Sequence, residues 1–157
     1  MQRFVLVEER VAAPDVDVLK GDGGTVAISD FRGKVVLLNF WATWCPPCIR
    51  EMPALDRLQS DLGGDDFAVV AVSTDAGGKA VAEPYLRDRL GLTNLDLYLD
   101  PKFTAWKTYQ AGGLPTSFVI DRQGRLVGAL VGEAEWDGDD AKALFRHLIN
   151  EPVEISG

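Results

Sequence analysis

The sequence predicts an α/β fold in which a mixed central β-sheet is flanked by helices on both faces. Strand-like apolar runs at residues 34–41 and 67–74 alternate with segments of helical periodicity, and a strand–turn–strand pattern follows at residues 116–131. Strands that alternate with helices and end in a hairpin are typical of such a sheet. The length of 157 residues suits a single domain, and neither a repeat nor a long linker divides residues 1–157.

The first half of the chain is expected to provide two strands and one long helix. Residues 1–24 are expected to form an irregular segment that ends in a glycine-rich turn, before a short strand at residues 25–28. Residues 34–41 are a continuous apolar run, as expected for a strand covered on both faces. Beyond the cysteines, apolar residues recur every three or four positions, which predicts a helix that ends before Gly63. The residues of its apolar stripe are Ile49, Met52, Leu55, Leu58 and Leu62.

The second half is expected to add strands and helices in turn. Residues 67–74 form a second buried strand, followed by a helix at residues 79–90. A short strand at residues 95–100 and a short helix at residues 103–110 come next. The remaining expected elements are the hairpin strands at residues 116–121 and 125–131 and an amphipathic helix at residues 139–149.

The acidic composition argues against two classes of partner. A formal net charge of −8 does not suit nucleic acid, whose phosphates require a basic face, or an anionic lipid surface. No stretch approaches the roughly 18–20 apolar residues that a membrane helix needs. The apolar run at residues 4–7 is also too short for the core of a signal peptide. We therefore expect no binding of nucleic acid and no membrane span within these residues.

The only two cysteines of the chain, Cys45 and Cys48, are separated by Pro46 and Pro47. Cys45 follows the predicted buried strand and opens the predicted helix, where the unpaired N–H groups of the first turn and the helix dipole stabilise a thiolate. The two prolines suit this turn, in which their missing N–H groups cost nothing, and they stiffen the loop. We therefore expect Cys45 to attack a substrate disulfide and Cys48, which is turned further inward, to resolve the mixed disulfide.

Four interpretations of this pair compete. A zinc site needs three or four ligands, and the single histidine, His147, lies far along the chain in the last predicted helix, where a surface or boundary position is expected. A structural disulfide that closes so short a loop would stabilise the fold only weakly. A redox dithiol is favoured because C-x-x-C beside a strand–helix–strand pattern has that mechanism, and it needs neither a metal nor a cofactor. Copper(I) binding by the soft thiolates stays open as an alternative.

Two motifs give the chain a family resemblance. The segment "NFWATWCPPC" resembles the active-site segment of the thioredoxin fold, and Pro53 matches the proline that kinks the helix of that fold. The segment "GGLPTSFVID" resembles the loop that holds the cis-proline of the family, which implies a cis bond at Pro115. The resemblance implies a thioredoxin-like fold over nearly the whole chain.

Longer segments narrow this resemblance to one branch. Residues 28–58 are similar to the TlpA, ResA and CcmG/DsbE proteins, and residues 131–144 look especially like the C-terminal part of TlpA proteins. The resemblance implies a periplasmic or extracytoplasmic thiol–disulfide oxidoreductase, with a membrane anchor in the full-length protein. The implied clients are disulfides of apocytochrome c or of assembly proteins for the copper centres of cytochrome oxidase. A membrane electron donor of the CcdA or DsbD type would re-reduce a monomeric protein, and an oxidant working in the opposite direction is the alternative.

The resemblance also implies roles for residues around the cysteines. Thioredoxins carry a buried aspartate six residues before the first cysteine, and this chain has Asn39 there, which cannot take a proton. Glu51 matches a glutamate of the ResA-like branch and shares a helix face with Cys48. Our hypothesis is that Glu51 is the acid/base for Cys48, with a pKa raised by partial burial and by the nearby thiolate, and the alternative is a solvated acid in the first turn.

The remaining candidates would bind the substrate. Trp44 is expected on the rim of the site and Trp41 in the core. The backbone of Leu114, before the cis-proline, would pair with an extended substrate segment. Thr116 would contact the sulfur atoms or simply begin the next strand. The predicted substrate-binding residues are Trp44, Pro46, Pro47, Leu114, Pro115 and Thr116.

Overall fold

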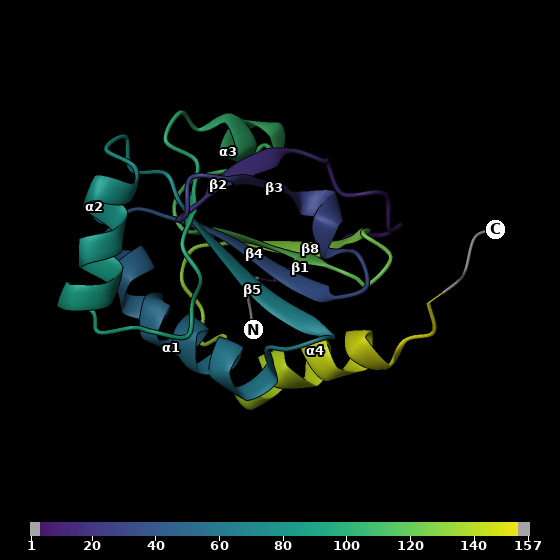
Figure 1. The fold of residues 1–157 in the computed structure, drawn as a ribbon. Helices are drawn as coiled ribbons and strands as arrows, with labels where there is room; N and C mark the ends of the chain where they lie inside the picture. The colour runs from purple at the N-terminus through teal and green to yellow at the C-terminus, as the bar shows by residue number, and fades with distance from the viewer. Residues whose placement is uncertain (1–3, 154–157) are drawn as a thin grey trace.

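The computed structural model describes residues 4–153 of the chain. Its strands are β1 (Val5–Leu6), β2 (Asp17–Lys20), β3 (Thr25–Ala27), β4 (Val35–Trp41), β5 (Phe67–Ser73), β6 (Tyr98–Leu99), β7 (Thr116–Ile120) and β8 (Leu126–Val131). These described strands form one sheet in the order β1-β8-β7-β4-β5-β6-β2-β3 (Figure 1). β4, β5 and β6 run parallel and the other neighbours antiparallel, so the expected mixed sheet is confirmed.

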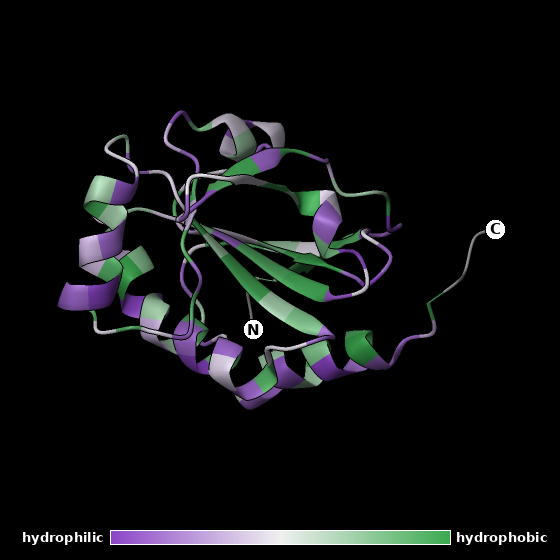
Figure 2. Ribbon diagram, in the orientation of Figure 1, coloured by the Kyte–Doolittle hydropathy of each residue, from purple (hydrophilic) through white to green (hydrophobic). Residues whose placement is uncertain are grey.

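Helices cover both faces of the sheet, as predicted. They are α1 (Pro46–Leu62), α2 (Lys79–Pro84), α3 (Thr104–Thr108) and α4 (Asp139–Asn150), with a 3-10 turn η1 (Ile28–Phe31) and a π-helical turn η2 (Tyr85–Arg89). α1, α2 and α4 pack on one face, whereas α3 and η1 pack on the other (Figure 1). The central strands are strongly hydrophobic, while α1 and α4 alternate between hydrophobic and hydrophilic residues (Figure 2).

Alternate side chains of β4 enter two separate hydrophobic clusters. Leu37 and Trp41 pack toward α1 and α4, which confirms the core position expected for Trp41. Leu38 and Phe40 pack toward α3. Burial on both faces explains why the strand is apolar at every position except Asn39.

The expectation that residues 1–24 are irregular is wrong in part. β1 pairs with β8, Ala12 forms a bridge with Arg125, and β2 pairs with both β3 and β6. These segments are short and largely exposed, and Val18 is the one buried residue of β2, so no hydrophobic alternation marks them. These segments pair through backbone hydrogen bonds at the edges of the sheet. Such pairing needs few buried side chains, so it leaves little hydrophobic pattern in the sequence.

Two other elements are shorter than expected. The helix expected at residues 79–90 ends as α2 at Pro84 and continues as the π-helical turn η2. Proline has no N–H to bond the carbonyl four residues earlier and its ring crowds that carbonyl, which disrupts the short α2 here, whereas the longer α1 continues past Pro53. Of the strand expected at residues 95–100, only Tyr98–Leu99 pairs as β6.

The pairing of β4 with β7 brings two distant loops to one end of the sheet. Phe40, near the end of β4, lies opposite Thr116 at the start of β7. The loop that leads from β4 into α1 therefore lies beside the loop that precedes β7. These loops carry Cys45 and Pro115, so the fold places both predicted parts of the site together.

Candidate active site

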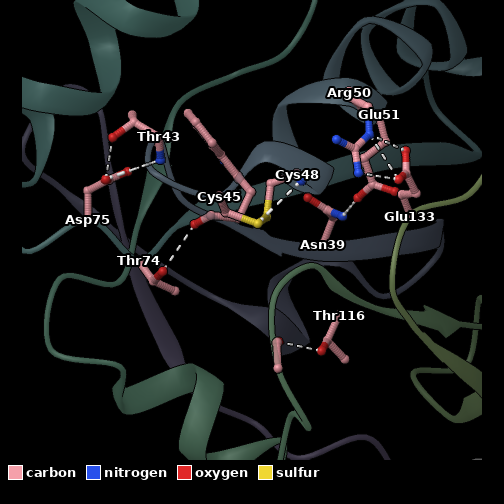
Figure 3. Close-up of a disulfide and its surroundings, with 12 residues drawn as sticks. Asn39, Thr43, Cys45, Cys48, Arg50, Glu51, Thr74, Asp75, Thr116 and Glu133 are labelled. Carbon is pink, nitrogen blue, oxygen red and sulfur yellow. Dashed lines mark hydrogen bonds and ion pairs between the residues drawn. A yellow bond between two sulfur atoms is a disulfide. The ribbon is translucent and has the colours of Figure 1, made fainter.

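A disulfide joins Cys45 and Cys48 at the start of α1 (Figure 3). Cys45 is the N-cap residue, and its Sγ accepts a hydrogen bond from the backbone N–H of Cys48 at 3.3 Å. Pro46 and Pro47 occupy the first helical positions, where their missing N–H groups remove no hydrogen bond. Cys48 is fully buried and Cys45 keeps 4% of its surface exposed. Cys45 is therefore the outer sulfur and the one that meets the positive end of the helix dipole.

Glu51 is buried one helical turn beyond Cys48, with 2% of its surface exposed. Its Oε1 accepts a hydrogen bond from Asn39 Nδ2 at 2.7 Å. Its Oε2 accepts the backbone N–H of Ala134 and the Nε1–H of Trp136, each at 3.1 Å. Burial raises the pKa of Glu51 to about 7, although these donors oppose the rise. The alternative of a solvated acid is therefore wrong, and Glu51 can exchange a proton near neutral pH.

Asn39 connects β4 to this carboxylate. It lies directly opposite Ser117 of β7, and their side chains share one face of the sheet. Nδ2 of Asn39 donates to Glu51 Oε1 and, at 2.9 Å, to Ser117 Oγ. Its Oδ1 is buried and has no hydrogen-bond partner among the described residues. The position that holds an aspartate in thioredoxins is thus occupied by a polar side chain that cannot titrate.

The connection between β8 and α4 was missed in the sequence. Ala134 and Trp136 of this connection reach Glu51 across sequence separations of 83 and 85 residues. Trp136 is fully buried, and its ring lies 6.2 Å from that of Phe145 on α4. The connection has no helical or strand periodicity. Its two signals are a single tryptophan within a polar segment and the resemblance of residues 131–144 to TlpA proteins, and neither points to a contact with Glu51.

A second missed cluster holds the loop before Cys45. The carboxylate of Asp75, buried just after β5, accepts hydrogen bonds from the backbone N–H of Thr43 and from Thr43 Oγ1 at 2.7 Å. It also accepts a hydrogen bond from Ser73 Oγ at 2.6 Å. These bonds tie the loop to the end of β5, and the contact between Thr43 and Asp75 is visible in Figure 3. The adjacent Trp44 is 65% exposed. Trp44 therefore has the rim position expected of it, and its role in docking stays a prediction.

The Leu114–Pro115 peptide bond is cis, as the resemblance implied. The carbonyl of Pro115 accepts the N–H of Gly132 at 2.8 Å, which ties this loop to the segment after β8. Thr116 begins β7 and donates its hydroxyl to the carbonyl of Gly113 at 2.6 Å. Of the two roles considered for Thr116, the start of the strand is the one that these contacts show. Substrate binding by this loop stays a prediction.

His147 occupies a surface position on α4, as expected. Its side chain is 71% exposed, and Nε2 lies 3.6 Å from the carboxylate of Glu151. Within residues 4–153, no group of three or more His, Cys, Asp or Glu side chains lies close enough to hold a metal ion. The same part of the chain includes no helix that is long and apolar enough to cross a membrane.

The sheet order, the cysteine pair that opens α1 and the cis-proline before the adjacent strand define the class of protein. This is a thioredoxin-like fold with a redox-active C-x-x-C pair. The chain belongs to the AhpC/TSA family, whose family model matches residues 10–129.

Individual similar proteins narrow the assignment of this chain within the family. It is 35% identical over 121 residues to the thiol-disulfide oxidoreductase ResA of Bacillus thuringiensis, and this alignment covers 77% of this chain and 68% of ResA. The structure of a thiol:disulfide interchange protein DsbE from Chlorobium tepidum matches with a TM-score of 0.79 and 31% identity, over 92% of this chain and 99% of that one. The exposed lipoprotein thioredoxin Etrx1 of Streptococcus pneumoniae matches with a TM-score of 0.66 and 31% identity, over 86% and 98% respectively. The protein is thus a thiol–disulfide oxidoreductase of the TlpA/ResA/CcmG-like group, as its motifs implied.

Proposed function

We propose that this oxidoreductase is a reductant that removes disulfide bonds from extracytoplasmic client proteins. One observation carries the chemistry: Cys45 Sγ caps the N-terminus of α1 and accepts the N–H of Cys48. A thiolate in this position is stabilised by the same donor and by the helix dipole, which makes Cys45 the nucleophile. The resemblance to the TlpA, ResA and CcmG reductases supports the direction of electron flow.

The reaction transfers two electrons from the cysteine pair to the client disulfide. The Cys45 thiolate attacks one client sulfur, the client S–S bond breaks, and the other client sulfur leaves as a thiolate that takes up a proton. The Cys48 thiolate then attacks the Cys45 sulfur of the mixed disulfide and releases the first client sulfur as a second thiolate. The products are a reduced client and the Cys45–Cys48 disulfide seen in this structure.

Glu51 serves as the acid/base for Cys48. It follows Cys48 by three residues on α1, so the two side chains lie on the same side of the helix. Since burial raises the pKa of Glu51 to about 7, its carboxylate can accept the Cys48 proton and return it to a departing client thiolate. Ala134 and Trp136 both donate to Oε2, whereas Asn39 Nδ2 alone donates to Oε1 among the described residues, so Oε1 keeps a lone pair that can carry the proton.

Client docking is assigned to the surface around Cys45. Trp44 offers an exposed aromatic ring next to the nucleophile. The loop before β7 offers the backbone of Leu114, which pairs with an extended client segment as in strand addition. The proposed docking residues are Trp44, Pro46, Pro47, Leu114, Pro115 and Thr116.

The proposed setting is the extracytoplasmic side of a membrane, with an anchor in the full-length protein. The clients are apocytochrome c or assembly proteins for the copper centres of cytochrome oxidase, and a membrane thiol-electron donor of the CcdA or DsbD type re-reduces the pair. The resemblance to TlpA, ResA and CcmG supports this setting, as does the similarity to Etrx1, an exposed lipoprotein. A monomeric state suits an electron carrier that docks in turn with its electron donor and with its client protein.

The reduction potential of the Cys45–Cys48 pair tests the direction. The protein is equilibrated in dithiothreitol or glutathione buffers, and the oxidised fraction is read by thiol trapping and mass spectrometry. A value near or below about −200 mV supports a reductant, whereas a value near about −120 mV reverses the direction of electron flow. A pair that forms no disulfide at any buffer potential overturns the exchange chemistry and leaves copper(I) binding as the next candidate.

Single-cysteine variants test the two roles separately. Cys48→Ser should accumulate a mixed disulfide with a disulfide-containing client peptide, because Cys45 attacks and nothing resolves the product. Cys45→Ser is the matched control and should accumulate none. Equal trapping by both variants would contradict the assigned roles.

A further inference from the structure

The amide of Asn39 has one end without a partner in the disulfide form. Nδ2 donates to Glu51 Oε1 at 2.7 Å and to Ser117 Oγ at 2.9 Å, which uses both of its hydrogens. Oδ1 is, among the described residues, the one buried side-chain oxygen or nitrogen without a hydrogen bond. A buried carbonyl oxygen without a donor is costly. The disulfide form therefore carries a penalty that another state of the site can relieve.

The placement of Asn39 directs this oxygen toward the cysteines. Its nitrogen end contacts Glu51, and Cys48 lies one turn earlier on the same side of α1. In the view of Figure 3, the nitrogen of the Asn39 amide points to Glu51 and the oxygen lies on the side of Cys48. Asn39 and Cys48 are both completely buried. A neighbouring side chain that gains a hydrogen can therefore serve as the donor for Oδ1.

Reduction of the pair creates such a donor. An external dithiol such as dithiothreitol supplies two electrons, the Cys45–Cys48 bond breaks, and the dithiol becomes a disulfide. Cys45 then keeps a thiolate at the N-terminus of α1, while the sulfur of Cys48 takes up a proton. The S–H of Cys48 is a hydrogen-bond donor that the disulfide lacks.

We infer that Asn39 is a positioning residue whose Oδ1 accepts the Cys48 S–H in the dithiol form and has no partner in the disulfide form. Asn39 thereby biases the equilibrium of the pair toward the dithiol. The inference rests on the cycling of the pair between its two forms, as in the proposed function. It does not depend on the direction of electron flow or on proton transfer by Glu51.

The inference predicts a shift in the thiol–disulfide equilibrium constant. Leucine at position 39 has a similar size and no polar atoms, so Asn39→Leu removes the penalty from the disulfide form and the acceptor from the dithiol form. The equilibrium constant should move toward the disulfide by roughly tenfold, given the ordinary cost of a buried unpaired polar group. Tenfold corresponds to about 30 mV for a two-electron couple. A purely structural residue would destabilise both redox forms alike and leave the constant unchanged.

The test measures this constant against dithiothreitol at neutral pH for the full chain and its variants. Ser117→Ala is the matched control, because it removes a partner of Nδ2 and leaves Oδ1 intact. We expect a shift for Asn39→Leu, no shift for Ser117→Ala, and the same shift for Asn39→Leu in a Glu51→Gln background. Equal constants for wild type and Asn39→Leu, or an equal shift for Ser117→Ala, would overturn the inference. The absence of any disulfide–dithiol equilibrium would instead overturn the proposed function.

A second measurement leaves Asn39 unchanged, so it does not depend on the folding of a core variant. In Cys45→Ser, Cys48 keeps its thiol, and the S–H stretching band can be read by infrared spectroscopy. We expect this band below the frequency of a thiol without an acceptor, because Oδ1 accepts its hydrogen. A band at the frequency of a free thiol would refute the contact.

Discussion

Raising the pH from about 5 to about 8 should destabilise the oxidised protein, because Glu51 holds its proton more tightly in the folded chain than in the unfolded one. Burial raises the pKa of Glu51 in the folded chain to about 7, whereas its ordinary value is 4.5. Between these two values the unfolded state releases the proton first. Each step up in pH within this window therefore favours unfolding.

The expected loss in the free energy of unfolding is about 2–3 kcal/mol between about pH 5 and about pH 8. Most of it falls below pH 7, because above the pKa of the folded chain both states are deprotonated. Asp15 acts in the opposite sense, since the backbone N–H and hydroxyl of Ser29 lower its pKa below 3.8. Its contribution is lost only under more acidic conditions, outside this window.

Urea unfolding of the disulfide form at a series of pH values measures this loss. The disulfide keeps the two thiols out of the titration, and Glu51→Gln is the matched variant because glutamine does not titrate. Wild type should lose stability as the pH rises, whereas Glu51→Gln should give a nearly flat profile over the same range. Identical profiles for the two proteins would refute the argument that a buried Glu51 determines the pH dependence.

Three further changes test other parts of the site. Trp44→Ala should change the free energy of unfolding by less than about 0.5 kcal/mol, since the ring is exposed. The same change should raise KM for a protein disulfide roughly tenfold, and an unchanged KM would show that Trp44 is not part of the docking surface. Asp75→Ala should cost about 2–4 kcal/mol in urea unfolding, because it leaves the N–H and hydroxyl of Thr43 without their acceptor, and a cost below about 0.5 kcal/mol would show that this cluster does not hold the loop. Phe145→Ala should cost about 3–5 kcal/mol, because the ring is fully buried against Phe67 and Trp136, and a smaller loss would mean that the core closes over the cavity.

The parts of the fold that the sequence predicted are those with a strong local pattern. β4 and β5 are continuous apolar runs because the sheet is covered on both faces, and α1 and α4 show the periodicity of helices with one buried side. β1 and β2 were not predicted, because pairing through backbone groups at a sheet edge needs little burial of side chains. Pro84 was a local signal for the end of α2, since proline disrupts the interior of a helix, although Pro53 lies inside α1 without ending it.

The sequence by itself predicted the thiol–disulfide chemistry of Cys45 and Cys48, because the spacing, the two prolines and the helix start are all local features. Only the tertiary structure decided the surroundings of Glu51, whose donors Asn39, Ala134 and Trp136 come from β4 and from the connection before α4. The pKa of a carboxyl depends on how many atoms exclude water from it and on which donors reach it. In this chain those atoms come from segments as far as 85 residues away from Glu51, and local periodicity cannot report them.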